Sequence, residues 1–204
     1  MEVLALDCLA PEFYQRPTVE VARDLLGSLL VRRLKEGLVA VRLTEVEAYL
    51  GEGDPAAHTY RGRRTARNAS MWEEGGRLYV YFTYGLHHCA NVVTGRAGEG
   101  EAVLLRGGVV VSGHELVRAR RGGREDLRGP AKLCQGLEID RSLDGAPLTP
   151  AAGIWVARDG AEVRPEQVAA LPRVGVAYAG EAAGWPLRFL LRPAPGGGAG
   201  AGAP

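Results

Sequence analysis

The chain has 204 residues, of which 46% are hydrophobic and 24% are charged, and its formal net charge is +1. This length suits one domain with a single core, and the composition is that of an ordinary globular protein. No run approaches the roughly 18 apolar residues that a membrane-spanning helix needs. Glu2 and Asp7 interrupt the start of the chain, so no secretory signal is predicted and we expect a cytoplasmic protein without a membrane partner.

The number and spacing of the cysteines argue against a fold held together by disulfide bonds or by a structural metal. Cys8, Cys89 and Cys134 are widely spaced, and only four histidines accompany them. Because the chain also lacks a CxxC pair, neither a disulfide framework nor a structural zinc site is predicted. We expect no metal and no cofactor.

In chain order, the first predicted elements are a short helix after Pro17 and two strands, 28–34 and 38–49, that turn at 35–37. A polar, turn-rich loop follows over 51–66, and loops of that length in compact domains are usually functional or disordered.

The patterns further along predict short helices, a hairpin and several strands. The predicted helices are 68–74, 114–121, 129–137 and 166–170, and the predicted strands are 78–84 and 89–93 as a hairpin, 102–111, 154–157, 173–178 and 187–191. Together these elements indicate one mixed α/β (α+β) domain over residues 1–192, with a largely antiparallel, curved sheet, surrounding short helices and a protruding β-hairpin. Residues 193–204 contain only Pro, Gly and Ala and are predicted to be a disordered tail.

Almost all positive charge comes from arginine, since Lys35 and Lys132 are the only lysines. The arginines gather in two clusters, which are Arg61, Arg63, Arg64 and Arg67, and Arg118, Arg120, Arg121, Arg124 and Arg128. The guanidinium group of arginine can donate two parallel hydrogen bonds to a phosphate, so either cluster could contact nucleic acid. Basic patches are common, however, and both clusters could equally be solvated surface.

Two carboxylates stand near the end of the predicted strand 38–49. With a strand's period of two residues, Glu45, Glu47 and Tyr49 continue the apolar face that includes Val39. Either the strand emerges into solvent there, or a carboxylate lies at the rim of a pocket as a general base. A neighbouring arginine would keep such a carboxylate ionised, and Arg106 is the candidate.

Tyrosines are concentrated in the predicted hairpin. Tyr79 and Tyr81 share one strand face, and Tyr84 stands beside Gly85 at the turn. High β-propensity alone explains tyrosines in strands. Exposed aromatics at such a tip would also suit a protein that stacks on an extruded base and fills the gap left in the duplex. His58 in the preceding loop could line the same pocket.

Nine short segments, in order, resemble the alkyladenine (3-methyladenine) DNA glycosylase family. They are residues 44–51, 54–58, 63–68, 78–81 with 84–85, 89–91, 103–106, 129–135, 173–176 and 186–189. Each segment is weak evidence alone, but the ordered set is specific and spans nearly the whole chain apart from the tail. By this resemblance the chain is identified as a bacterial member of the family.

The resemblance implies a monofunctional DNA glycosylase of base excision repair. Such an enzyme flips alkylated or deaminated purines out of duplex DNA and hydrolyses the N-glycosidic bond, leaving an abasic site. It implies that Glu47 deprotonates the attacking water, with Arg106 and the main-chain carbonyl of Val174 holding that water. Lys35 and Lys132 lie outside the pocket segments, so no strand-cleaving lyase activity is expected.

The resemblance assigns the other site residues to a base pocket, an intercalating wedge and DNA-backbone contacts. The base pocket comprises Tyr49, His58, Tyr81 and Asn91. The wedge comprises Tyr84 and Leu86, and the backbone contacts are Arg63, Thr65 and Lys132. The implied partner is double-stranded DNA that contains damaged purines, and a monomer is expected.

Two other interpretations remain open on the sequence. One is a module that binds distorted DNA without cutting it. The other is a metal-dependent nuclease that uses Glu45, Glu47 and His58, although a third acidic ligand in register is not evident.

Overall fold

The computed structural model describes residues 6–83, 85 and 87–192. Within them the helices are α1 (Pro11–Tyr14), α2 (Thr18–Leu25), α3 (His114–Arg120) and α4 (Pro130–Leu137). The strands are β1 (Asp7–Cys8), β2 (Leu29–Leu34), β3 (Gly37–Tyr49), β4 (Leu78–Thr83), β5 (His87–Thr94), β6 (Glu101–Ser112), β7 (Ile154–Arg158), β8 (Val168–Leu171) and β9 (Arg188–Leu191). Short 3-10 helices occupy several connections, including Gly51–Gly53, Tyr60–Gly62, Ala69–Trp72 and Ala177–Gly184.

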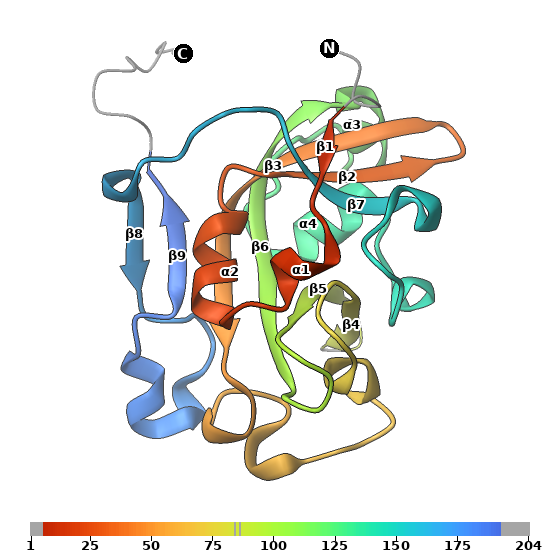
Figure 1. The fold of residues 1–204 in the computed structure, drawn as a ribbon. Coiled ribbons are helices and arrows are strands. Elements are labelled where there is room, and N and C mark those ends of the chain that lie inside the picture. The colour runs from red at the N-terminus through yellow and green to blue at the C-terminus, as the bar shows by residue number, and fades with distance from the viewer. Residues whose placement is uncertain (1–5, 84, 86, 193–204) are drawn as a thin grey trace.

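The strands described form one antiparallel sheet in the order β1-β7-β2-β3-β6-β5-β4, with β9 joining β3 to β8 (Figure 1). The long strand β3 organises this sheet. β2 pairs with its first half and β9 with its second half, while β6 runs along its other side. The predicted single mixed domain around a mostly antiparallel sheet is confirmed.

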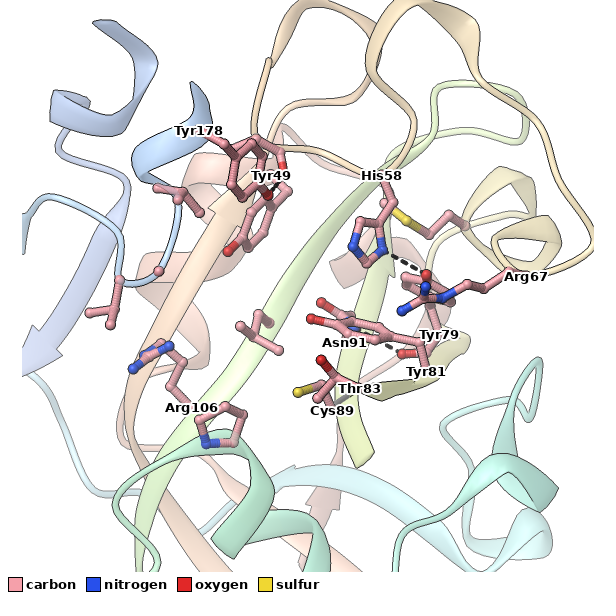
Figure 2. Close-up of a pocket in the computed structure, with 17 residues that line it drawn as sticks. Tyr49, His58, Arg67, Tyr79, Tyr81, Thr83, Cys89, Asn91, Arg106 and Tyr178 are labelled. Atoms are coloured by element: carbon pink, nitrogen blue, oxygen red, sulfur yellow. Dashed lines mark hydrogen bonds between the residues drawn. The ribbon is translucent and has the colours of Figure 1, made fainter. Parts of the chain in front are cut away.

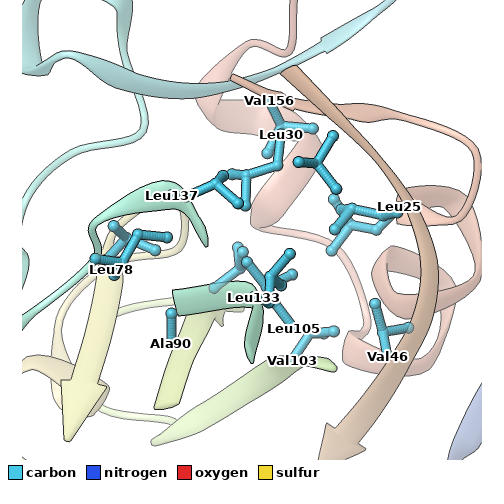
Figure 3. Packing of buried hydrophobic residues seen from close by; sticks show 14 of the residues in the cluster. Leu25, Leu30, Val46, Leu78, Ala90, Val103, Leu105, Leu133, Leu137 and Val156 are labelled. Atoms are coloured by element: carbon cyan, nitrogen blue, oxygen red, sulfur yellow. The ribbon is translucent and has the colours of Figure 1, made fainter. Parts of the chain in front are cut away.

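Alternate residues of four neighbouring strands face opposite sides of the sheet. One side packs against α2 and α4 and forms the main core, as Figure 3 shows for Leu25, Leu133 and Leu137. The strand residues in this core are Val46 and Ala48 of β3, Val103 and Leu105 of β6, Ala90 and Val92 of β5, and Leu78 and Val80 of β4. The residues between them face away from this core, and several of those line a cavity.

The predicted face of β3 is wrong in one respect. Val39, Val41 and Leu43 belong to the core, but the next core residue is Val46 rather than Glu45. The pairing with β6 shifts register between Leu43 and Val46, so β3 changes the face that its odd-numbered residues present. The two carboxylates therefore lie opposite the apolar face that they were expected to continue.

Two other predicted elements differ. Residues 173–176 are not a strand, and residues 177–184 form a 3-10 helix. Gly175 has a φ of 77°, which an extended strand does not allow. Residues 168–170, predicted as part of the helix 166–170, belong instead to the strand β8 because this segment pairs with β9. The other predicted elements are confirmed to within a few residues, whereas β1 and α1 were not predicted.

The hairpin of β4 and β5 lies at one end of the strand order. The two wedge residues, Tyr84 and Leu86, and the tail 193–204 lie outside the described residues, so the domain boundary at residue 192 stays a prediction. Among the described residues, no helix is long and apolar enough to cross a membrane.

Candidate active site

A cavity of about 360 Å³ opens on the face of the sheet opposite α2 (Figure 2). Its walls come from β3, β4, β5 and β6 and from two loops, 50–72 and 172–178. The lining residues include Tyr49, His58, Arg67, Tyr79, Tyr81, Cys89, Asn91, Leu104, Arg106, Val174 and Tyr178. Aromatic rings and a few polar groups dominate this lining, as in sites for flat organic ligands.

Glu47 lies beneath this cavity and is 0% exposed. The main-chain N–H of Val174 donates a hydrogen bond to its Oε1 at 2.8 Å, and the Tyr49 hydroxyl donates to its Oε2 at 2.9 Å. Arg106 Nε lies 3.4 Å from Oε1. All three of these neighbours line the cavity, so the carboxylate borders it rather than the apolar core.

The irregular pairing of β3 with β6 explains the position of Arg106. Leu105 pairs with Val46 and Gly107 pairs with Glu45, so Arg106 falls between two paired positions. From there its Nε donates to Glu45 Oε1 at 3.0 Å and also faces the second carboxylate, Glu47. Arg188 on β9 donates to the same Glu45 oxygen at 3.0 Å. Two carboxylates and two guanidinium groups therefore balance one another.

Burial raises the pKa of Glu47, and the adjacent carboxylate of Glu45 adds to this rise. Arg106, the Val174 N–H and the Tyr49 hydroxyl oppose it by stabilising the ionised form. The result is a buried carboxylate whose ionised form is stabilised by three neighbours at the edge of the cavity.

A buried ion pair fixes the segment that carries Val174. Arg173 forms a two-pronged contact with Asp54, with Nη2 donating to Oδ1 at 2.8 Å, and both side chains are fully buried. Arg173 Nη1 also donates to the carbonyl of Ala48 at 3.0 Å. The guanidinium lies 4.7 Å from the ring centre of Tyr49. One pair thus positions both donors to Glu47.

Aromatic rings stand on two sides of the cavity (Figure 2). Tyr49 lies on one side, and His58 and Tyr81 lie across from it, with their ring centres 4.7 Å apart at a steep angle. The structure therefore brings the three predicted stacking residues to one cavity. Asn91 lies at the cavity wall, where its Nδ2 donates to the Tyr79 carbonyl at 3.0 Å and fixes the amide plane.

His58 is held in its neutral form. Burial, together with the nearby positive charges of Arg67 and Arg63, lowers the pKa of His58 to about 4. Its Nδ1 lies 2.7 Å from the hydroxyl oxygen of Tyr79, so the two groups share a hydrogen bond. An uncharged ring in this position can stack on a flat ligand without adding charge.

The loop after β3 carries the first arginine cluster, and Asn68 holds its shape. The buried Asn68 Nδ2 donates to the carbonyls of His58 at 2.9 Å and Arg63 at 2.8 Å. Its Oδ1 accepts from the Thr65 main-chain N–H at 2.7 Å and from the Thr65 hydroxyl at 3.1 Å. Arg63 and Thr65 themselves are exposed beside the cavity.

The second arginine cluster is largely bound to the protein's own acceptors. Its contacts are Arg118 with Glu115 and Glu125, Arg120 with Glu36 and Glu138, Arg121 with Gln135, and Arg128 with Asp126. Lys132, a predicted phosphate contact, also pairs with Asp126 at 2.6 Å. The solvated-surface interpretation fits this cluster better than it fits the first.

Several residues of the site were not predicted. Tyr79 was placed on the right strand face but given no role. Asn68 acts through contacts within its own loop, whereas Asp54 and Arg173 join distant segments. Nothing in the local sequence indicates those contacts. The exposed Tyr178 stands at the cavity rim and donates a hydrogen bond to the Ala56 carbonyl at 3.1 Å.

Comparison with known proteins agrees with this geometry. The family model described as methylpurine-DNA glycosylase matches residues 12–195. A protein of Streptomyces avermitilis, provisionally named a 3-methyladenine DNA glycosylase, is 47% identical over 188 residues, covering 90% of this chain and 87% of its own. The human DNA-3-methyladenine glycosylase is 42% identical over 200 residues, covering 92% of this chain and 66% of its own.

The fold, the aromatic cavity and these relatives define a DNA glycosylase, a hydrolase of N-glycosyl bonds that acts in base excision repair. Within that class, the chain belongs to the methylpurine-DNA glycosylase family. The resemblance noted in the sequence is thereby confirmed.

Proposed function

We propose that this enzyme removes alkylated and deaminated purines from double-stranded DNA, without cutting the strand, by a water molecule that Glu47 activates. The observation that carries this proposal is the buried, ion-paired Glu47 at the border of an aromatic cavity. The coarser statement, that its partner is DNA, follows from the family.

The neighbours of Glu47 suit base catalysis of hydrolysis. A general base must be ionised at the working pH, and Arg106 and two hydrogen-bond donors stabilise that form. The same negative charge would stabilise an oxocarbenium-like sugar as the purine leaves. Arg106 and the Val174 main chain, whose carbonyl we propose as an acceptor, would hold the water beside it.

The aromatic walls suit an extruded purine. Tyr49 on one side and His58 and Tyr81 on the other present flat faces to the cavity, and Asn91 presents an amide at its wall. A base that has left the duplex regains stacking in such a slot, which offsets a cost of a few kcal/mol for extrusion. Lesions that weaken base pairing need less free energy for extrusion, so they are favoured before the base makes any contact with the pocket.

Contacts outside the cavity complete the proposal. Tyr84 and Leu86 would fill the gap left in the duplex, while Arg63, Thr65 and Lys132 would contact the DNA backbone. Lys132 would have to exchange its pairing with Asp126 for a phosphate. We also propose that the enzyme works as a monomer in the cytoplasm, without a metal or a cofactor.

The decisive experiment uses Glu47→Gln on duplexes that each carry one defined lesion. Glutamine keeps the size of the side chain but cannot take a proton from water. We expect lesion-duplex affinity within about threefold of the wild type and a loss of base release by at least about 10²-fold, the range typical of general-base removal. Base release is measured by alkaline cleavage of the abasic product, and affinity by gel shift.

Glu45→Gln is the matched control, because Glu45 shares Arg106 but lacks the contacts of Glu47 with Tyr49 and Val174. Its base release should fall much less. Undiminished release by Glu47→Gln would refute the assignment of the base. Binding without release by the wild type on every lesion would favour a DNA-binding module. Strand cleavage that needs no alkali and that a chelator abolishes would favour the metal-dependent nuclease.

A further inference from the structure

Arg67 connects the base cavity to the β4–β5 hairpin. It lies between two 3-10 helices in the loop after β3, and its guanidinium reaches the cavity lining (Figure 2). Nη2 donates to the Phe82 carbonyl at 3.1 Å, near the end of β4. The guanidinium carbon lies 5.4 Å from the ring centre of Tyr81, and Tyr79 lines the same side of the cavity.

The charge of Arg67 is the one in this cavity that has no opposite partner among the described residues. Arg106 faces Glu45 and Glu47. Below the cavity, Arg173 is paired with Asp54. Arg67, by contrast, contacts a carbonyl and an aromatic ring, both of them uncharged. The cavity therefore carries an excess of positive charge on the side of Tyr79 and Tyr81.

Arg67 also favours the uncharged form of His58. The Nδ1 of His58 shares a hydrogen bond with the Tyr79 hydroxyl, 2.7 Å away. The nearby guanidinium of Arg67 helps to lower the pKa of His58, so it disfavours a second proton on the ring. The His58 ring therefore adds no positive charge to the cavity.

We propose that Arg67 is a specificity-determining residue that favours neutral lesions, such as hypoxanthine, over cationic ones, such as 7-methylguanine. The inference rests on the proposed function. When water attacks, its oxygen bonds to C1′, its proton passes to Glu47, and the electron pair of the C1′–N9 bond leaves with the purine. A neutral purine departs with negative charge, which Arg67 stabilises until solvent supplies a proton. A cationic purine departs neutral, and before that Arg67 repels it from the cavity.

The test compares the wild type with Arg67→Met on two matched duplexes, one with hypoxanthine and one with 7-methylguanine. Methionine keeps the length of the side chain and removes its charge. Under single-turnover conditions we expect the ratio of the hypoxanthine rate to the 7-methylguanine rate to fall about three- to tenfold, as expected for one partly screened charge near the purine. An unchanged ratio, or an equal loss for both lesions, overturns the proposal.

Two further variants separate charge from shape. Arg67→Lys keeps the charge, so it should retain most of the wild-type ratio; a ratio as low as that of Arg67→Met would refute the electrostatic explanation. Arg64→Met removes a charge three residues away, where Arg64 packs over Trp72 at 4.0 Å outside the cavity lining. It should alter both rates alike, and a shift in the ratio equal to that of Arg67→Met would also overturn the proposal.

The outcomes also distinguish this inference from the proposed function. If the wild type releases neither base, the proposed function fails. If it releases both, and the ratio is the same in Arg67→Met, the proposed function stands and only the role of Arg67 fails.

Discussion

Glu47 holds its position through contacts that come from three different parts of the chain. Tyr49 is two residues away on the same strand, Arg106 is on β6, and Val174 follows the buried Arg173. Burial favours the protonated carboxyl, whereas each of these contacts favours the ionised one. The proposed chemistry depends on this balance, because only the ionised form can accept a proton from water.

Removing the Tyr49 hydroxyl tests this balance. Tyr49→Phe keeps the stacking ring but loses one hydrogen bond to Glu47, so the pKa of Glu47 should rise further. Because the base must be ionised, the acidic limb of the pH–rate profile should shift to higher pH. A hydrogen bond to a charged group contributes about 1.5 kcal/mol, so the rate at neutral pH should fall by up to about tenfold. Single-turnover rates across pH measure both effects.

Tyr81→Phe is the matched control, because it removes a hydroxyl from the opposite wall, where the nearest partner is Cys89. Its acidic limb should coincide with that of the wild type. Equal shifts in the two variants would show that the Tyr49 hydroxyl does not act through Glu47.

At the residue level, the sequence predicts most of the groups that line the cavity. Glu47, Tyr49, His58, Tyr81 and Asn91 were each expected there, and the structure brings them together. Their roles remain proposals. The partners that orient them could not be predicted, because Asp54 and Arg173 are ordinary charged residues until the fold places them in contact.

On the scale of elements, β3 shows why a strict two-residue period misleads. Core residues follow it up to Leu43 and resume at Val46, because the pairing with β6 is irregular between these positions. A single added residue in a strand moves every later side chain to the other face. This shift places Glu47 at the cavity and Ala48 in the core.

Deleting Thr44 should therefore be far more damaging than substituting it. The deletion would restore a regular period and turn the two carboxylates toward the apolar core, where unpaired charge is not tolerated. We expect loss of the cooperative thermal transition, observed by circular dichroism. Thr44→Ala keeps the chain length and should cost no more than about 1 kcal/mol. A deletion variant that unfolds cooperatively near the wild-type temperature would contradict the explanation.

Element type was predictable where pattern and pairing agree. The β2–β3 and β4–β5 hairpins combine alternation with turn residues and were predicted within a few positions. Residues 173–178 also alternate, yet Arg173 is drawn into the interior by Asp54 and the chain turns at Gly175. Residues 168–171 become a strand because β9 offers a partner, which the local sequence does not reveal.

Across the whole molecule, the pair of Asp54 and Arg173 joins segments 119 residues apart. Asp54 also accepts hydrogen bonds from the main-chain N–H groups of Leu50 at 3.0 Å and Ala56 at 2.9 Å. Burial alone would raise the pKa of Asp54, but the hydrogen bonds from Arg173 and these two N–H groups lower it overall. The pair therefore stabilises the fold at pH values above the ordinary carboxyl pKa, and this contribution is lost as the pH falls through the lowered value.

Asp54→Asn keeps the shape of the side chain but leaves the Arg173 charge buried without an opposite partner. We expect the free energy of unfolding at neutral pH to fall by about 3–5 kcal/mol. Urea denaturation measures the loss. Asp159→Asn breaks the more exposed pair with Arg42 and should cost about 1 kcal/mol or less. Similar losses in both variants would show that the buried pair has no special role.

The two arginine clusters have a consequence for how the enzyme searches a chromosome. Four of the five arginines in the second cluster are already held by internal acceptors, whereas the first cluster, beside the cavity, packs against aromatic rings and carbonyls. Few phosphates would then be neutralised, and few condensed cations released, when the protein rests on undamaged DNA. Such weak adhesion, with a shallow dependence on salt, permits short residence and rapid hopping, so the enzyme can spend most of its bound time at sites where a base is already loosely paired.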